Sequence, residues 1–131
     1  MKNYKIFISH SWKYGKDYYT VEEWLDNEFG NKWQNMSVPE HDAIEYTSDL
    51  ELEEKINEKI KNSSGVIIIS GMYVNYSEWI NKEIKMALNY NKSMIGIKPR
   101  GNEKVPLIIS DNTELVNWNS TSVITAIKEN F

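Results

Sequence analysis

Hydrophobic residues along this chain fall into two patterns, short unbroken runs and spacings of three or four residues. The clearest run, GVIIIS at residues 65–70, has only apolar side chains between its first and last positions. A run of this kind is typical of a strand that is covered on both faces in a parallel sheet. Shorter β-rich runs predict the remaining strands, at residues 4–9, 36–38, 94–97 and 115–116.

Helical spacing of apolar residues separates these runs and predicts four main helices. They cover residues 17–29, a segment that follows Ser48 and ends at residues 62–65, a segment from Ser77, and a last segment whose inward residues are Val123, Ile124 and Ile127. Two pairs, Thr20 with Glu23 and Ser48 with Glu51, have the spacing of a capping box. In that motif a side-chain oxygen at the helix start accepts a backbone hydrogen bond.

The alternation of strands and helices along the chain predicts an α/β fold. Strands joined by helical crossovers form a parallel sheet, and the right-handed crossovers place helices on both of its faces. Five strands in this arrangement most often take the order 2-1-3-4-5 of flavodoxin-like proteins. The chain has 131 residues and contains no internal repeat or linker, so we expect a single domain over residues 1–131.

Composition and charge exclude several classes of function. The formal net charge of −4, with 15 scattered lysines and arginines, gives no basic surface that would attract nucleic acid or an anionic membrane. The chain has no cysteine, which excludes disulfides and thiolate metal sites, and with 2 histidines we expect no metal site. The sequence has no signal peptide and no apolar run of membrane-spanning length, so we expect a soluble cytoplasmic protein.

One predicted helix contains a carboxylate among its apolar residues. In SEWINKEIKMAL, residues 77–88, a helical wheel with Trp79 at zero places Glu83 at about 40°, inside the arc of apolar side chains. An ionised carboxylate that is buried without a partner costs several kcal/mol. Glu83 therefore either lies at the margin of the buried arc, where it reaches water or a nearby lysine, or belongs to a functional site.

The predicted sheet order indicates where a ligand would bind. In open α/β sheets ligands bind beyond the carboxyl ends of the strands, at the point where the winding of the sheet reverses. Here that point brings together the loop 9–15, the loop 71–76 and the first turns of the helix that carries Glu83. A carboxylate beside aromatic rings and hydroxyl groups suits cleavage of an N-glycosidic bond, because it stabilises an oxocarbenium-like transition state.

Other chemistries that use this architecture match the sequence poorly. A response-regulator receiver needs acidic residues after the first and third strands, where this chain has SHS at residues 9–11 and SGM at residues 70–72. The GxGxxG and Walker A patterns of nucleotide-binding loops are absent from the sequence. Phosphotransfer and binding of a nucleotide by a glycine-rich loop are therefore not expected.

Several residues near the predicted ligand site have two interpretations. His10 is either a ligand-binding residue or a solvated loop residue. Trp12 and Tyr14 either contact a base or a partner, or they form a packing lid. Trp79 combines a core position with the wall of a pocket. Arg100, which follows the fourth strand, either meets a pyrophosphate or is an exposed turn residue.

Motifs at these positions resemble those of TIR domains. KIFISHS at residues 5–11 resembles the first-strand motif, and Ser77-x-Trp79-x-x-x-Glu83 resembles the SxWxxxE segment of NAD-consuming TIR enzymes, whose glutamate is catalytic. Further blocks are similar to the ThsB-like TIR family of bacterial Thoeris anti-phage systems, namely FISHSW, SVPEH, VIIISGMYVNYSEWI, IGIKPRG and NWNSTSVITAI.

This resemblance implies an NAD+-consuming enzyme of anti-phage defence. Glu83 would act on the nicotinamide ribose, NAD+ would be the substrate and not a cofactor, and nicotinamide would be released. The ADP-ribose moiety would then be cyclised or transferred, giving a nucleotide signal for a separate effector protein. Ser9, His10, Trp12 and Trp79 would line the nucleotide site.

The long polar loop Pro39–Asp49 takes the place of the TIR BB loop, which helps to complete a neighbouring site in active assemblies. The resemblance therefore implies self-association through this loop. Two other functions stay open. One is a non-catalytic TIR adaptor that acts through protein contacts. The other is an enzyme similar to nucleoside deoxyribosyltransferases, which would keep the bond chemistry and change the substrate.

Overall fold

The computed structural model describes residues 2–9, 16–37, 48–101 and 104–131, with the backbone alone for residues 72–76. Within these residues five strands form one parallel sheet in the order β2-β1-β3-β4-β5, which confirms the flavodoxin-like order predicted from the sequence. The strands are β1 (Tyr4–Ser9), β2 (Trp33–Asn35), β3 (Gly65–Ile69), β4 (Ser93–Ile97) and β5 (Glu114–Val116).

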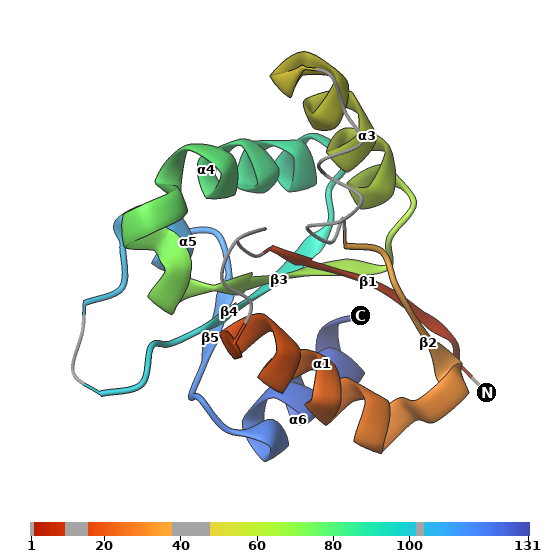
Figure 1. Cartoon of the computed structure of the whole chain (residues 1–131). Coiled ribbons are helices and arrows are strands. Elements are labelled where there is room, and N and C mark those ends of the chain that lie inside the picture. The colour runs from red at the N-terminus through yellow and green to blue at the C-terminus, as the bar shows by residue number, and fades with distance from the viewer. Residues whose placement is uncertain (1, 10–15, 38–47, 102–103) are drawn as a thin grey trace.

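Helices cover both faces of the sheet. The described helices are α1 (Lys16–Phe29), α3 (Asp49–Lys61), α4 (Tyr73–Asn89), α5 (Leu107–Ser110) and α6 (Ser120–Asn130), with 3-10 turns η1 (Gly30–Lys32) and η2 (Ser70–Met72). In Figure 1, α3 and α4 lie above the sheet, and α1 and α6 lie below it. None of the described helices combines the length and the apolar character that a membrane span requires.

The strand β3 forms the centre of the hydrophobic core. All five of its residues are buried, and the side chains of Ile67, Ile68 and Ile69 have no exposed surface. Because helices cover both faces of the sheet, only an unbroken apolar run satisfies both sides of this strand. Gly65 begins the strand, and a Cβ atom there would lie 2.4 Å from the ring of Phe131, which packs in its place.

Two elements begin three or four residues away from their predicted starts, whereas α1, β4 and β5 begin within one residue of theirs. β2 occupies Trp33–Asn35 and not residues 36–38, because the register of β1 pairs Tyr4 with Trp33. Met36 extends the pairing with β1 by one further hydrogen bond, since its N–H donates to the Ile6 carbonyl at 2.8 Å. The helix α4 begins at Tyr73 and not at Ser77, because η2 leads directly into it.

One of the two predicted capping pairs is correct. Ser48 is the N-cap of α3, and its side chain accepts a hydrogen bond from the Glu51 N–H at 3.2 Å. Thr20, in contrast, lies inside α1, and its hydroxyl donates to the Lys16 carbonyl at 3.0 Å. A threonine within a helix makes this bond to the preceding turn, so the capping spacing alone did not mark the start of α1.

Candidate functional site

The ends of β1 and β3 lie where the sheet reverses its winding. The chain passes from β1 to α1 below the sheet, whereas it passes from β3 to α4 above the sheet (Figure 1). The two strands pair in parallel, with Ser9 beside Ile68. The carboxyl ends of these two strands therefore form the place at which the sequence predicted a ligand.

Glu83 of α4 reaches this place and is buried there. Its exposed fraction is 3%, and the fully buried Ser9 donates a hydrogen bond from Oγ to Glu83 Oε1 at 2.5 Å. Burial raises the pKa of the Glu83 carboxyl to about 8, and the hydrogen bond from Ser9 opposes this rise. In the free protein this carboxyl therefore holds its proton at neutral pH.

The lysine next to Glu83 in the sequence is engaged by other carboxylates. Lys82 Nζ lies 3.3 Å from Glu53 Oε2 on α3 and 3.8 Å from Glu78 Oε1 on α4. The structure thus places Glu83 inside the buried arc of α4 and not at its margin, where it would reach water or a lysine.

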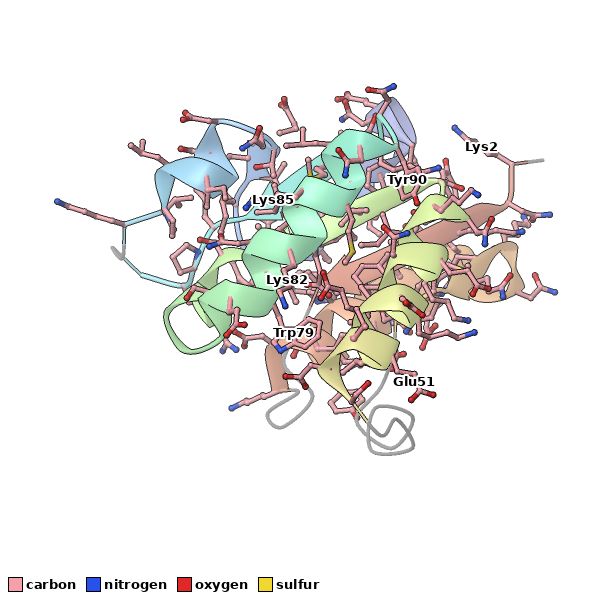
Figure 2. All side chains as sticks on the ribbon, turned by 90° about the horizontal axis from the view of Figure 1, so that it is seen from above. Lys2, Glu51, Trp79, Lys82, Lys85 and Tyr90 are labelled. Carbon is pink, nitrogen blue, oxygen red and sulfur yellow. The ribbon has the colours of Figure 1, made fainter. Side chains whose placement is uncertain are left out.

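Trp79 lies one helical turn before Glu83 on α4, on the same side of the helix. Its half-buried side chain packs against the hydrophobic core. The Lys82 ammonium covers one face of the indole at 4.7 Å from the ring centroid, and both residues can be followed in Figure 2. The contact with the core agrees with the predicted core position of Trp79, and a cation occupies one face of its ring in this structure.

Two predicted binding residues, His10 and Trp12, lie outside the described residues, as does Tyr14. The loop Pro39–Asp49 also lies outside them, except for its last two residues. Of the five predicted site residues, the structure therefore brings Ser9 and Glu83 into contact and places Trp79 beside them on α4.

Arg100 lies near the carboxyl ends of the strands, where two contacts hold it. Its guanidinium pairs with the Asp17 carboxylate in the first turn of α1, and it lies 4.9 Å from the centroid of the Trp118 ring. Trp118 packs in turn against Trp24 of α1, with ring centroids 5.0 Å apart. Arg100 therefore lies exposed in the bend after β4, as one of its two interpretations expected, and is also paired with Asp17.

The sequence interpretation did not identify Ser70 as a candidate site residue. This serine follows β3 directly, its exposed fraction is 4%, and its Oγ has no hydrogen-bond partner among the described residues. The signal in the sequence was a hydroxyl residue that ends an apolar run at the carboxyl end of a central strand.

The sequence interpretation also did not identify a cluster of hydrogen-bonded polar side chains that connects β2 and the residues after it to α1 and β1. Asn35 Nδ2 donates to Tyr18 Oη at 2.5 Å and to Glu22 Oε2 at 2.7 Å. The Ser37 N–H donates to Asn35 Oδ1, and Ser37 Oγ accepts a hydrogen bond from the Ile8 N–H, both at 2.9 Å. These bonds fix the end of β2 at the place where the segment 38–47 begins.

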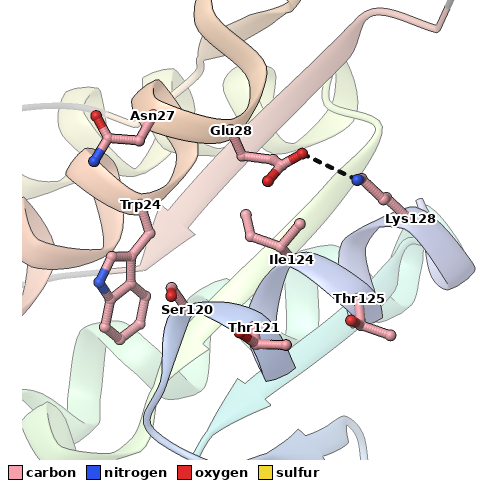
Figure 3. Close-up of a pocket in the computed structure, with 8 residues that line it drawn as sticks. All are labelled: Trp24, Asn27, Glu28, Ser120, Thr121, Ile124, Thr125 and Lys128. Atoms are coloured by element: carbon pink, nitrogen blue, oxygen red, sulfur yellow. Dashed lines mark hydrogen bonds and ion pairs between the residues drawn. The ribbon is translucent and has the colours of Figure 1, made fainter.

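Two grooves lie between pairs of helices, and their described lining residues include neither Ser9 nor Glu83. The groove between α1 and α6 has a volume of about 380 Å³ and is drawn in Figure 3. Glu28 Oε2 and Lys128 Nζ form an ion pair across it at 3.0 Å. The groove between α3 and α4 has a volume of about 340 Å³. Among the described residues, no cluster of three histidine or acidic side chains could hold a metal ion.

Comparison with known proteins gives one family and a fold. A family model described as "Thoeris protein ThsB, TIR-like domain" matches residues 7–104, which is most of the chain and includes Ser9, Trp79 and Glu83. No curated protein matches the sequence.

Two solved structures are similar in fold. The CMP N-glycosidase BcmB of Clostridium botulinum has a TM-score of 0.59 and 13% identity, over 95% of this chain and 98% of that chain. A 3-dehydroquinate dehydratase-like protein from Bifidobacterium longum has a TM-score of 0.52 and 12% identity, over 99% of this chain and 95% of that chain. At such low identity these similarities concern the fold alone.

Proposed function

The chain belongs to the family of Thoeris ThsB TIR-like domains, which is related to defence, and we propose that it cleaves the bond between nicotinamide and ribose in NAD+. The observation that carries this proposal is the buried pair formed by Glu83 and Ser9 at the carboxyl end of β1. A carboxyl group in this position has little structural reason to exist, because an apolar residue would fill the same space without a desolvation penalty. Its position at the reversal of the sheet suits a group that meets a ligand.

The proposed reaction breaks the bond between the ribose C1′ atom and the nicotinamide nitrogen. The electron pair of that bond goes to the nitrogen, which neutralises the pyridinium ring, and positive charge develops on the ribose. The Glu83 carboxylate stabilises this charge. Water or a hydroxyl group of the ADP-ribose moiety then forms the new bond to C1′ and loses its proton to solvent, which gives a free, cyclised or transferred ADP-ribose.

The protonation of Glu83 links substrate charge to catalysis. A neutral carboxyl cannot stabilise a cation as a carboxylate does, and the raised pKa of Glu83 keeps it neutral in the free protein. The nicotinamide ring of NAD+ carries a positive charge, and a cation near a carboxyl lowers the carboxyl pKa. Binding of NAD+ would therefore release the proton from Glu83 and create the catalytic carboxylate.

In this proposal the product is a nucleotide that diffuses to a separate effector protein, so NAD+ is a substrate and the enzyme needs no cofactor. His10 and Trp12 would complete the nucleotide site together with Ser9 and Trp79. Self-association through the loop Pro39–Asp49 would complete the site of a neighbouring copy. The roles of His10, Trp12 and this loop are proposed from the family resemblance, because these positions, apart from the last two residues of the loop, lie outside the described residues.

The decisive experiment compares the wild-type protein with Glu83→Gln, which keeps the shape and neutral polarity of the side chain. Small molecules are analysed by mass spectrometry in cells that express each protein, with and without phage challenge, and nicotinamide release is measured on the purified proteins. We expect Glu83→Gln to lower product formation by at least about a hundredfold, because one electrostatic contact in the transition state contributes on this scale. The matched control is Glu78→Gln on the same helix, where the side chain is 81% exposed.

The same experiment distinguishes the other functions that the sequence left open. Full turnover by Glu83→Gln would refute the assignment of this residue. A non-catalytic adaptor would protect Glu83→Gln cells from phage and would form no nicotinamide at any protein concentration. Exchange of bases on free nucleosides, with NAD+ left intact, would favour an enzyme similar to nucleoside deoxyribosyltransferases.

A further inference from the structure

Ser70 is a buried serine at the point where β3 ends and η2 begins. Its Oγ is inaccessible to solvent and has no hydrogen-bond partner among the described residues. Burying a hydroxyl group without a hydrogen bond is unfavourable, and alanine would occupy the same space without this penalty. A buried polar group without a partner therefore calls for an explanation, and a missing ligand is one of the few available.

Ser70 lies between the strand β3 and the helix α4 that carries Glu83. Ser9 pairs with Ile68 in the parallel register of β1 and β3, so these two side chains lie on one face. The hydrogen bond between Ser9 and Glu83 identifies that face as the one covered by α4. Ser70 begins the 3-10 turn η2 directly after β3, and η2 leads into α4, the helix that carries Glu83.

The neighbouring Gly71 indicates on which side of the sheet the Ser70 side chain lies. A Cβ atom built on Gly71 would lie 3.7 Å from Asp17 Oδ2, which belongs to α1 on the opposite side of the sheet. Successive side chains in a 3-10 turn point about 120° apart, so the Ser70 side chain is directed away from this α1 side. Ser70 also lies beyond the end of β3, past the level at which Ser9 pairs with Ile68, and thus toward the region that a ligand would enter.

One other described side chain has a buried atom without a partner, and its position separates it from Glu83. Asn81 lies on α4, and its Oδ1 has no hydrogen-bond partner among the described residues. It precedes Glu83 by two residues, which corresponds to about 200° around the helix. Asn81 therefore faces away from the buried carboxyl. Ser70, in contrast, directly follows β3, which pairs with the strand that carries Ser9.

We propose that the Ser70 hydroxyl binds substrate at the Glu83 site, by a hydrogen bond to a hydroxyl group of the ribose whose glycosidic bond breaks. This proposal rests on the proposed function, because it assumes that Glu83 acts on a ribose. Glu83 faces the reacting carbon of the sugar, and Ser70 fixes the orientation of the ring from the turn that follows β3. A sugar hydroxyl is a suitable partner, because it can both donate to and accept from the serine.

The test uses three variants of the full chain. Ser70→Ala removes the hydroxyl. The double variant with Ser70→Ala and Glu83→Gln is compared with Glu83→Gln alone, so that NAD+ binding can be measured by calorimetry without turnover. Ser63→Ala is the matched control, because Ser63 is also buried and its Oγ donates to the Ile60 carbonyl at 2.7 Å. Analogues of NAD+ that lack the 2′ or the 3′ hydroxyl of the nicotinamide ribose serve as probes.

We expect Ser70→Ala to weaken NAD+ binding by about threefold to tenfold, which is the range for one uncharged hydrogen bond. The loss should disappear with the analogue that lacks the bonded hydroxyl, because the two changes remove the same contact. The melting temperature should stay the same or rise in Ser70→Ala and should fall in Ser63→Ala.

The inference is overturned if Ser70→Ala binds NAD+ as tightly as its parent, or if it weakens all analogues equally. A fall in its melting temperature that equals that of Ser63→Ala also overturns it, since Ser70 would then have a structural partner. Failure of the proposed function has a different result, in which Glu83→Gln retains full turnover while Ser70→Ala still weakens binding. A wild-type protein that neither binds nor cleaves NAD+ refutes both.

Discussion

Glu83→Gln should remove a large dependence of protein stability on pH. The carboxyl pKa is 4.5 in the unfolded chain and about 8 in the folded protein, because burial disfavours the charged form. Between these two values the folded state holds the proton and the unfolded state releases it. Stability from this group is therefore fully present below about pH 4.5 and is lost as the pH rises toward 8.

The size of the effect follows from the same two pKa values. Between pH 5 and pH 8, linkage predicts that Glu83 lowers the free energy of unfolding by about 3 kcal/mol. Glutamine does not titrate, so the Glu83→Gln variant lacks this loss. The glutamine amide changes the hydrogen bonding of this buried site by the same amount at every pH, so the pH dependence is the informative quantity and not the stability at one pH.

The assay is urea unfolding of the wild type and Glu83→Gln at intervals from pH 5 to pH 8. The free energy of the variant minus that of the wild type should increase by about 3 kcal/mol across this range. Glu78→Gln on the same helix is measured as the exposed control, because the Glu78 side chain is 81% exposed. A difference between the wild type and Glu83→Gln that does not change with pH would refute the assignment of a buried, protonated carboxyl.

Three further predictions concern catalysis and packing. First, kcat/KM for NAD+ should rise with pH through an apparent pKa near 8, because the free enzyme must lose the Glu83 proton, and a pH profile measures this. Second, Ser9→Ala should destabilise the protein by about 1–2 kcal/mol in urea unfolding and move that profile to higher pH, since the bond that opposes the raised pKa is lost. Third, Gly96→Ala should lower the free energy of unfolding by about 1–3 kcal/mol, because its Cβ would lie 2.4 Å from Thr113 Oγ1. Thermal unfolding measures this effect, and Gly71→Ala is the control, because a Cβ atom on Gly71 would have its nearest neighbour at an ordinary contact distance of 3.6 Å.

The sheet and the position of Glu83 could be predicted from the sequence because both depend on local pattern. The unbroken run at residues 65–69 is typical of a strand in the centre of a parallel sheet, and such a strand has helices on both sides. The wheel that placed Glu83 among apolar residues was confirmed by its 3% exposure. Periodicity reports which side of a helix is buried, and Glu83 lies on that side.

The remaining features depend on contacts between distant parts of the chain. The start of β2 at Trp33 is set by its pairing with Tyr4, which no local pattern contains. The lack of a partner for Ser70 Oγ is a property of its surroundings in the folded chain and cannot be read from the residue itself. The raised pKa of Glu83 likewise results from how completely the fold removes water from its carboxyl.

The outer strands of the sheet have a consequence for how copies of the chain can assemble. β2 and β5 lie at the two sides of the sheet and contain three residues each. An outer strand offers its unpaired backbone groups to other chains, and very short strands offer few of them. Copies of this protein are therefore poorly suited to join by extending the sheet from one molecule to the next. Fibrous aggregation along that direction is disfavoured, and any ordered filament would have to be built from helical surfaces and connecting loops.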